Sequence, residues 1–300
     1  MNWKKIYLYG GLALAMFFWA FSFIWYKVAF RNLEPIALIF FRLIVASVSI
    51  SIILLFSGKF EKINKQDYKL FLLLALLEPF LYFIGESYGM KIVSPTMGAI
   101  IISFIPLLSP ILAYYLFKEK LSWFNYAGIG ISFGGVILVL VGKNFILNTP
   151  IAGIALMMMA VVCAVGYSGT VFHLAKKYRP MTIIWVQSLI GTLLFLPLFL
   201  ALDLKETMEI QWSWEVISPI LKLGIFPSVL SYLFFTIAIR EIGMNKANVF
   251  ANFIPVIVAV LSFFILKEEM PARKIIGIAL VLTGLIVSQR KKKIHPDEKH

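Results

Sequence analysis

The chain has little charge, one cysteine and none of the short motifs that mark metal or nucleotide chemistry. Charged residues make up 14% of its 300 positions, whereas a soluble domain averages about 25%. Cys163 has no partner for an intrachain disulfide and lies in an apolar run, so we expect it to pack. There is no His/Cys metal-ligand spacing, no phosphate-binding Gly-Lys loop and no ATPase motif. These absences predict that the protein is not an enzyme and has no cofactor or metal.

The composition is dominated by apolar residues. They make up 61% of the chain, and the mean hydropathy is +0.90. The apolar runs are continuous rather than alternating, which favours membrane helices over a membrane barrel. The sequence therefore predicts an all-α integral membrane protein with ten transmembrane helices. We place them near 6–26, 35–56, 69–89, 95–117, 123–141, 151–172, 181–201, 216–238, 246–266 and 274–290.

The basic residues indicate how the helices are oriented. The formal net charge is +13, but lysines and arginines are scattered over connectors and the tail at 291–300, which argues against a nucleic-acid partner. With the N-terminus in the cytoplasm, 18 of the 28 lysines and arginines lie on the cytoplasmic side, 9 lie opposite, and Arg42 lies within a span. Positive charge concentrates on the cytoplasmic side of membrane proteins. We therefore expect both termini, including the charged tail, to be cytoplasmic.

The chain also contains a long internal repeat. Residues 104–138 align without a gap to residues 253–287, with 10 of 35 positions identical. Each copy has a Phe-Ile-Pro start, an apolar run, a Lys-Glu turn and a second run with spaced glycines. A repeat of half the chain is too long for a solenoid. It predicts two five-helix halves, 1–145 and 146–290, and because five is odd, the second half is inverted relative to the first.

These features resemble the EamA branch of the drug/metabolite transporter superfamily. The resemblance rests on the two halves, the Lys-Glu turns, the Gly-x6-Gly helices, Trp19 to Ser22 in the first span, and Pro35 followed by Arg42 in the second. It implies a multi-pass carrier of the bacterial or archaeal inner membrane, often an exporter of amino acids or related metabolites. The superfamily also includes sugar and nucleotide-sugar carriers. Gln187 stands where the second half would repeat Arg42, so no ion-pair role transfers to that position.

Glu78 is the sharpest candidate for function. It lies about 15 Å from the cytoplasmic end of its span, at about 1.5 Å per residue, and Pro79 follows it. An ionisable group inside a span costs about 2.5–3.5 kcal/mol to insert and therefore needs a partner or a purpose. Three interpretations stay open: a proton-binding carboxylate, a clamp for a substrate amine, or a structural carboxylate paired with a neighbouring helix.

Arg42 lies about 10 Å into the second span from the outer side. Its forked donors suit a substrate carboxylate. Glu86, near the same outer side of the third span, is an equally good partner. A buried guanidinium needs a permanent counter-ion whenever substrate is absent. The sequence therefore favours a structural ion pair between Arg42 and Glu86.

Uncharged groups complete the expected site. Ser103 and Asn252 each precede a Phe-Ile-Pro start, and Asn248 lies one helical turn before Asn252. This spacing predicts that the fourth and ninth spans face each other across the substrate path; alternatively, these amides only hold helices together. The candidate substrate-binding or coupling residues are Glu78, Tyr82, Trp19, Ser103, Asn248, Asn252, Tyr232 and Arg42.

The leading hypothesis is a secondary transporter that moves a small metabolite outward by alternating access, with protons as a candidate coupling ion. A carrier of sugar or lipid-like substrates is one alternative, and a non-transporting membrane scaffold is another. The expected partners are a small-molecule substrate and the lipid bilayer. The spaced glycines are expected to bring helices into close contact, and the protein is expected to be a monomer or a homodimer.

Overall fold

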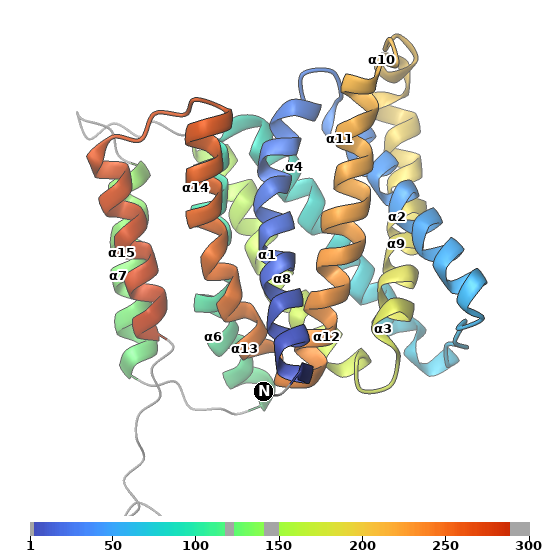
Figure 1. Cartoon of the computed structure of the whole chain (residues 1–300), viewed down its shortest axis with the longest axis horizontal. Coiled ribbons are helices and arrows are strands. Elements are labelled where there is room, and N and C mark those ends of the chain that lie inside the picture. The colour runs from blue at the N-terminus through green and yellow to red at the C-terminus, as the bar shows by residue number, and fades with distance from the viewer. Residues whose placement is uncertain (1–2, 118–122, 141–149, 289–300) are drawn as a thin grey trace, which may run out of the picture.

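A computed structural model of the chain describes residues 3–117, 123–140 and 150–288, and these residues contain helices and no strand. The long helices stand side by side with similar tilts, as expected for a membrane bundle (Figure 1). The elements of residues 3–140 are α1 (Trp3–Ala29), α2 (Pro35–Ser57), η1 (Lys65–Asp67), α3 (Tyr68–Ala75), η2 (Leu76–Leu81), α4 (Tyr82–Ile92), α5 (Pro95–Ile102), α6 (Ile105–Phe117) and α7 (Trp123–Leu140). Those of residues 150–288 are α8 (Ile151–Leu174), α9 (Pro180–Leu198), η3 (Phe199–Asp203), α10 (Leu204–Met208), α11 (Trp214–Ile225), η4 (Phe226–Ser231), α12 (Tyr232–Ile242), α13 (Met244–Val249), η5 (Phe250–Phe253), α14 (Ile254–Ile265) and α15 (Ala272–Ser288).

Eight helical segments of the described chain are long and apolar enough to cross a membrane. They are Ile6–Ala29, Pro35–Ser57, Lys65–Ile92, Pro95–Leu112, Ile151–Leu174, Pro180–Met208, Trp214–Ile242 and Met244–Leu266. Large apolar side chains such as Phe56 (87% exposed) and Leu193 (67%) point outward, where lipid would cover them. The all-helical membrane class is therefore confirmed. Eight of the ten expected spans meet this test, Trp123–Val139 is a shorter apolar helix, and the count of ten stays a prediction.

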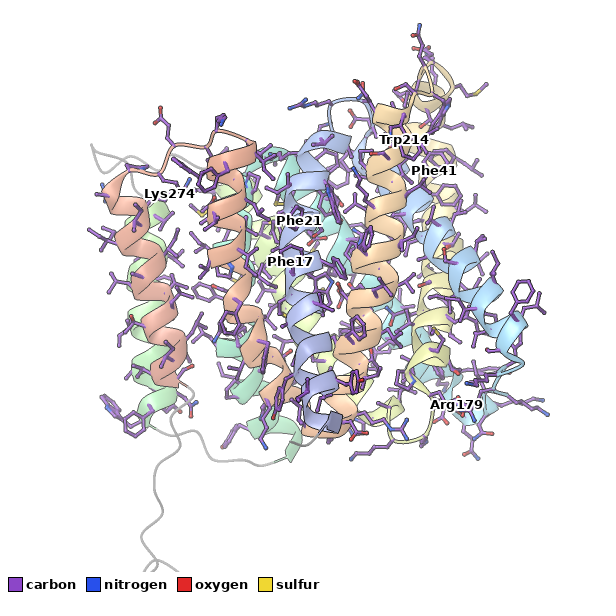
Figure 2. All side chains as sticks on the ribbon, in the orientation of Figure 1. Phe17, Phe21, Phe41, Arg179, Trp214 and Lys274 are labelled. Atoms are coloured by element: carbon purple, nitrogen blue, oxygen red, sulfur yellow. The ribbon has the colours of Figure 1, made fainter. Side chains whose placement is uncertain are left out.

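The positions of the first and last described helices agree with an even number of membrane crossings. The start of α1 and the end of α15 lie at the same end of the molecule (Figure 1). Arg179 lies at that end and Lys274 at the opposite one (Figure 2). Which end faces the cytoplasm stays a prediction, as does the division into 1–145 and 146–290. The first Lys-Glu turn (118–119), the boundary between the halves and the tail at 291–300 lie outside the described residues.

Glycines join α7 and α15 at van der Waals distance. A Cβ added to Gly128 would lie 2.4 Å from the carbonyl oxygen of Gly284, and one added to Gly135 would lie 2.7 Å from that of Gly277. The hydroxyl of Ser132 donates to a carbonyl of α15 at 3.0 Å. The repeated Gly-x6-Gly face is thus used within the chain, and it is not free to bind a second copy.

The antiparallel helices α2 and α9 cap each other reciprocally. Asp203, just beyond α9, accepts a hydrogen bond from the backbone N–H of Ala37 in the first turn of α2, at 2.8 Å. Glu61, just beyond α2, accepts one from the N–H of Arg179 at the start of α9, at 2.9 Å. A carboxylate at a helix N-terminus satisfies a free N–H and opposes the positive end of the helix dipole. This reciprocity is what an inverted repeat would produce.

Four spans are broken near their middles. The third breaks at Glu78, whose backbone is extended (φ −151°, ψ 119°), and the fourth turns between α5 and α6. The span Trp214–Ile242 departs from α-helix in η4, which contains Pro227, and the span Met244–Leu266 does so in η5, just before Pro255. Inside a membrane, irregular backbone is tolerated only where protein buries it or where it lines a cavity. The breaks therefore mark where a cavity is expected.

Candidate substrate site

A cavity of about 60 Å³, with both polar and apolar side chains in its lining, lies among the broken spans. A site needs roughly 10–15 Å³ of such volume to hold a water molecule, so this one has room for only a few. Its polar lining residues are all buried: Ser22, Arg42, Glu78, Tyr82, Glu86, Tyr167, Ser168, Tyr232 and Asn248. In this conformation the polar side chains of the site are thus shielded within the helix bundle.

Arg42 on α2 anchors one end of the cavity and is 2% exposed. Its Nε and Nη2 atoms donate to the hydroxyl of Ser228 at 3.0 and 2.8 Å, and its Nη1 donates to the hydroxyl of Tyr26 at 2.5 Å. The guanidinium also lies 4.2 Å from the centre of the Phe83 ring, a cation–π contact. All three of its nitrogens are thus already engaged within the protein.

A tyrosine stands between Arg42 and Glu86. The hydroxyl of Tyr26 accepts from Arg42 and donates to Glu86 Oε2 at 2.8 Å, while Tyr82 donates to Glu86 Oε1 at 2.9 Å. Within the described part of the chain, no ion pair joins Arg42 to Glu86. The expected direct pair is therefore wrong in its geometry. Ser228 binds the edge of the guanidinium formed by Nε and Nη2, and Nη1 faces Tyr26. The opposite charges of Arg42 and Glu86 therefore compensate each other through the hydroxyl of Tyr26.

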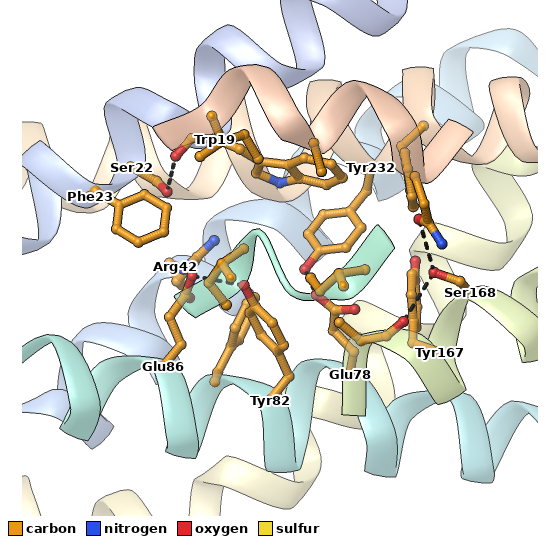
Figure 3. A pocket seen from close by; sticks show the side chains of 18 residues that line it. Trp19, Ser22, Phe23, Arg42, Glu78, Tyr82, Glu86, Tyr167, Ser168 and Tyr232 are labelled. Carbon is orange, nitrogen blue, oxygen red and sulfur yellow. Dashed lines mark hydrogen bonds between the residues drawn. The ribbon is translucent and has the colours of Figure 1, made fainter. Parts of the chain in front are cut away.

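Glu78 lies at the other end of the cavity, in the break of the third span, and is 5% exposed (Figure 3). Tyr232 donates a hydrogen bond to its Oε1. The Tyr232 ring in turn contacts the rings of Trp19 and Tyr167, with centroids 5.4 and 5.9 Å apart. The ion pairs of the described chain lie at helix ends, and none includes Glu78. Glu78 is thus a buried carboxylate with aromatic neighbours and no cation beside it.

The structure brings six of the eight predicted site residues to this cavity: Trp19, Arg42, Glu78, Tyr82, Tyr232 and Asn248. Asn248 also ties three helices together, because its Nδ2 donates to Ser109 at 2.7 Å and its Oδ1 accepts from Ser168 at 3.4 Å. Ser103 and Asn252 do not line the cavity. The hydroxyl of Ser103 donates instead to a carbonyl one turn earlier in α5.

Sequence reasoning overlooked Tyr26, Tyr167 and Ser228. Tyr26 lies one and two helical turns beyond Ser22 and Trp19, on the face of α1 that meets the cavity, so helical spacing could have identified it. Ser228 falls on Pro79 when the chain is shifted by the repeat offset of 149 residues. Because the alignment pairs this serine with a proline, the repeat gave no signal for Ser228. Nothing in the sequence distinguishes Tyr167 from other tyrosines in spans.

Taken together, the fold and the site define a helical membrane protein with a central polar cavity bounded by broken helices, an arrangement typical of secondary transporters. Within the described residues, no group of His, Cys, Asp and Glu side chains is placed to hold a metal ion.

Comparison with known proteins identifies the family. The EamA-like transporter family model matches residues 6–141 and 151–289. An uncharacterized transporter of Archaeoglobus fulgidus is 27% identical, the alignment covering 94% of this chain and 98% of the relative. The uncharacterized transporter YetK of Bacillus subtilis is 28% identical over 98% of this chain and 90% of its own. A solved crystal structure shares the fold, with a TM-score of 0.69 at 16% identity, covering 92% of this chain and 97% of that one. The chain belongs to the EamA-like transporter family.

Proposed function

We propose that this protein is a secondary transporter that moves a small metabolite through the central cavity by alternating access. The observation that carries the proposal is the central cavity with buried polar side chains, which lies between broken spans drawn from both parts of the chain. A site of this kind near the middle of the membrane can be opened to one side at a time when the two halves rock against each other. Membership of a transporter family supports the same conclusion.

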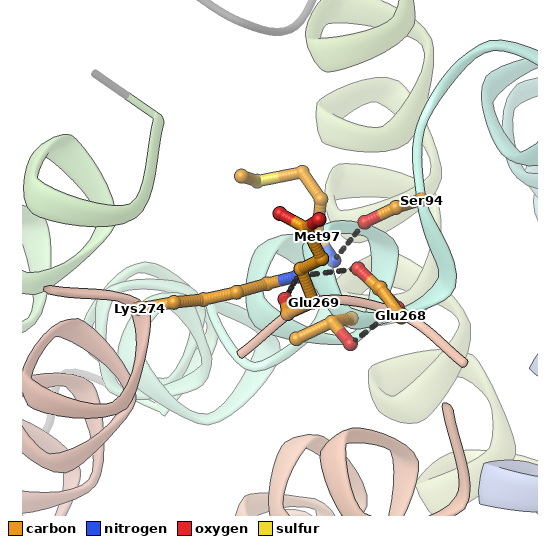
Figure 4. Close-up of polar contacts among 6 residues, drawn as sticks. Ser94, Met97, Glu268, Glu269 and Lys274 are labelled. Atoms are coloured by element: carbon orange, nitrogen blue, oxygen red, sulfur yellow. Dashed lines mark hydrogen bonds and ion pairs between the residues drawn. The ribbon is translucent and has the colours of Figure 1, made fainter. Parts of the chain in front are cut away.

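Polar contacts hold the two halves together at both ends of the bundle. At one end, Glu268 in the α14–α15 connection accepts from the hydroxyl of Thr96 on α5 at 2.8 Å and pairs with Lys274 (Figure 4). At the other end, Asp67 accepts from Lys177 at 2.7 Å and from Tyr178 at 2.8 Å. Opening either side requires the contacts at that end to break. Both sets of contacts are intact in this conformation.

Amino acids or related compounds are the proposed cargo, export is the proposed direction, and Glu78 is the proposed site of proton coupling. The titratable groups that interact with Glu78 are Arg42, Tyr82, Glu86, Cys163, Tyr167 and Tyr232. Of the carboxylates among them, Glu86 is linked to Arg42 through the hydroxyl of Tyr26, whereas the hydrogen-bond partner of Glu78 in the described chain is the uncharged Tyr232. A carboxylate in that position can release its proton to one side and take it up from the other as the cavity changes access.

Flux in proteoliposomes tests the proposal. Purified protein is reconstituted, and efflux of amino acids, the corresponding amines, sugars and nucleobases is measured with and without a pH gradient. We expect flux of at least one amino acid or related compound to be accelerated by the gradient, and Glu78→Gln to remove that acceleration. Glu269→Gln is the matched control, because Glu269 is an exposed carboxylate outside the cavity. Absence of flux across the whole panel would contradict the transporter assignment, and unchanged pH dependence in Glu78→Gln would contradict the coupling role.

One observation favours a second candidate, a carrier of lipid-like substrates. An apolar groove of about 590 Å³ lies between α14 and α15, lined by residues such as Val260, Phe263 and Leu282. A lipid tail would fit such a surface. However, the groove shares no lining residue with the central cavity, so none of the buried charges would contact its contents. Acceleration of fluorescent phospholipid exchange between leaflets would support this alternative.

A further inference from the structure

The charges that line the cavity do not cancel. Arg42 and Glu86 form a compensated set through Tyr26. Glu78 contributes a second negative charge, and among the described residues that line the cavity there is no lysine and no other arginine. An ionised carboxylate buried in a membrane protein is strongly disfavoured unless a cation lies beside it. The site is therefore one cation short, and either a proton or a positively charged ligand completes it.

Arg42 is poorly placed to hold the carboxylate of a substrate. Its three nitrogens donate to Ser228 and Tyr26, and Phe83 covers its face. Through Tyr26 its charge already compensates that of Glu86, so a substrate carboxylate beside Arg42 would bring a third negative charge to the described lining, whose one fixed cation is Arg42. A zwitterionic amino acid would thus find a partner for its ammonium group in Glu78, whereas its carboxylate would compete with Glu86 for Arg42.

The surroundings of Glu78 suit an organic cation. Tyr82, Tyr167 and Tyr232 lie around the carboxylate, with Trp19 on the far side of the Tyr232 ring (Figure 3). The faces of Trp and Tyr rings attract ammonium groups within about 6 Å, and more strongly when water is excluded. A carboxylate surrounded by aromatic rings suits a ligand that has a positive charge and an apolar or aromatic group. A proton alone would bind to the carboxylate without needing the rings.

We infer that the cavity binds a monovalent organic cation, an amine without a free carboxylate, through Glu78 and the surrounding rings. The inference rests on the proposed transport function and names the substrate class of the same site. The enclosed volume of about 60 Å³ accommodates the ammonium group in this conformation. The body of the ligand enters when the cavity opens to one side.

Three probes with the same ring test the inference: 2-phenylethylamine as the cation, L-phenylalanine as the zwitterion and 3-phenylpropionate as the anion. Their binding is measured by isothermal titration calorimetry on the full-length protein in nanodiscs of uncharged lipid, which do not attract amines electrostatically. We expect phenylethylamine to bind at least tenfold more tightly than phenylalanine. We expect phenylpropionate not to bind.

Variants then assign the binding to the cavity. Glu78→Gln is expected to weaken phenylethylamine binding at least tenfold, whereas Glu269→Gln, at an exposed carboxylate, leaves it unchanged. If Glu78→Gln does not fold, Trp19→Leu takes its place and is expected to weaken phenylethylamine binding several-fold while preserving the order of the probes.

Preference for phenylalanine or phenylpropionate would overturn the inference and leave the transporter assignment intact, because the cavity would still bind a metabolite. Absence of binding by all three probes would also overturn it, and the flux panel would then judge transport separately. Phenylethylamine binding that neither Glu78→Gln nor Trp19→Leu weakens would place the amine elsewhere and overturn the inference as well.

Discussion

Removing one hydroxyl should uncouple the buried charges of the cavity. In Tyr26→Phe the ring remains, so packing is preserved, but Arg42 Nη1 and Glu86 Oε2 each lose a hydrogen bond. A hydrogen bond to a charged group contributes about 1.5–3 kcal/mol. Arg42 keeps Ser228 and Glu86 keeps Tyr82, so the losses should fall at the lower end of this range. We expect the free energy of unfolding to drop by about 3 kcal/mol.

Equilibrium unfolding in mixed micelles titrated with sodium dodecyl sulfate measures this loss. Tyr7→Phe is the control, because Tyr7 is 75% exposed and its substitution should change stability by less than about 0.5 kcal/mol. In a Glu86→Gln background the effect of Tyr26→Phe should shrink by at least about 1 kcal/mol, because the two residues share one network. If Tyr26→Phe lowers the free energy of unfolding by an amount within about 0.5 kcal/mol of the control, the hydrogen-bonded link through Tyr26 is refuted. Full additivity in the double variant would refute it as well.

Two further predictions concern the helix contacts. Gly284→Val should separate α7 from α15 and destabilise the protein by about 1–3 kcal/mol, because a Cβ there would lie 2.3 Å from the hydroxyl of Ser132; Gly130→Val, with open space around it, should be tolerated in the same unfolding assay. Burial tends to raise the pKa of Glu268, but hydrogen bonds from Lys274 and nearby hydroxyls bring it below the ordinary value of 4.5. Its stabilising contribution should therefore be complete above pH 4.5 and should decline as the pH falls through the lower folded pKa. Glu268→Gln should flatten that decline when the free energy of unfolding is measured between about pH 6 and about pH 3. An unchanged pH dependence would contradict the stabilising role of the Glu268 contacts.

Periodic and compositional features made the fold largely predictable. Continuous apolar runs identified the eight long spans, since the membrane demands about 20 apolar residues in a row. Gly128 and Gly284 were recognisable as packing residues because their spacing repeats in both halves, and only residues without a Cβ allow backbones to touch. Glu78 was recognisable because a carboxylate is rare in an apolar run and Pro79 follows it. Each of these signals depends on residues that are close together in the sequence, so it can be recognised without the tertiary structure.

The sequence by itself determined that this is a helical membrane protein with a repeated segment (104–138 and 253–287), a buried carboxylate at Glu78 and a buried guanidinium at Arg42. Only the tertiary structure decided how those charges are paired. Tyr26 and Ser228 reach Arg42 from other helices, and this meeting depends on how α1, α2 and η4 pack rather than on any spacing along the chain. Ser103 and Asn252 fell outside the cavity for the same reason. A small rotation of each broken helix decides which side chains face inward, and no local pattern records that rotation.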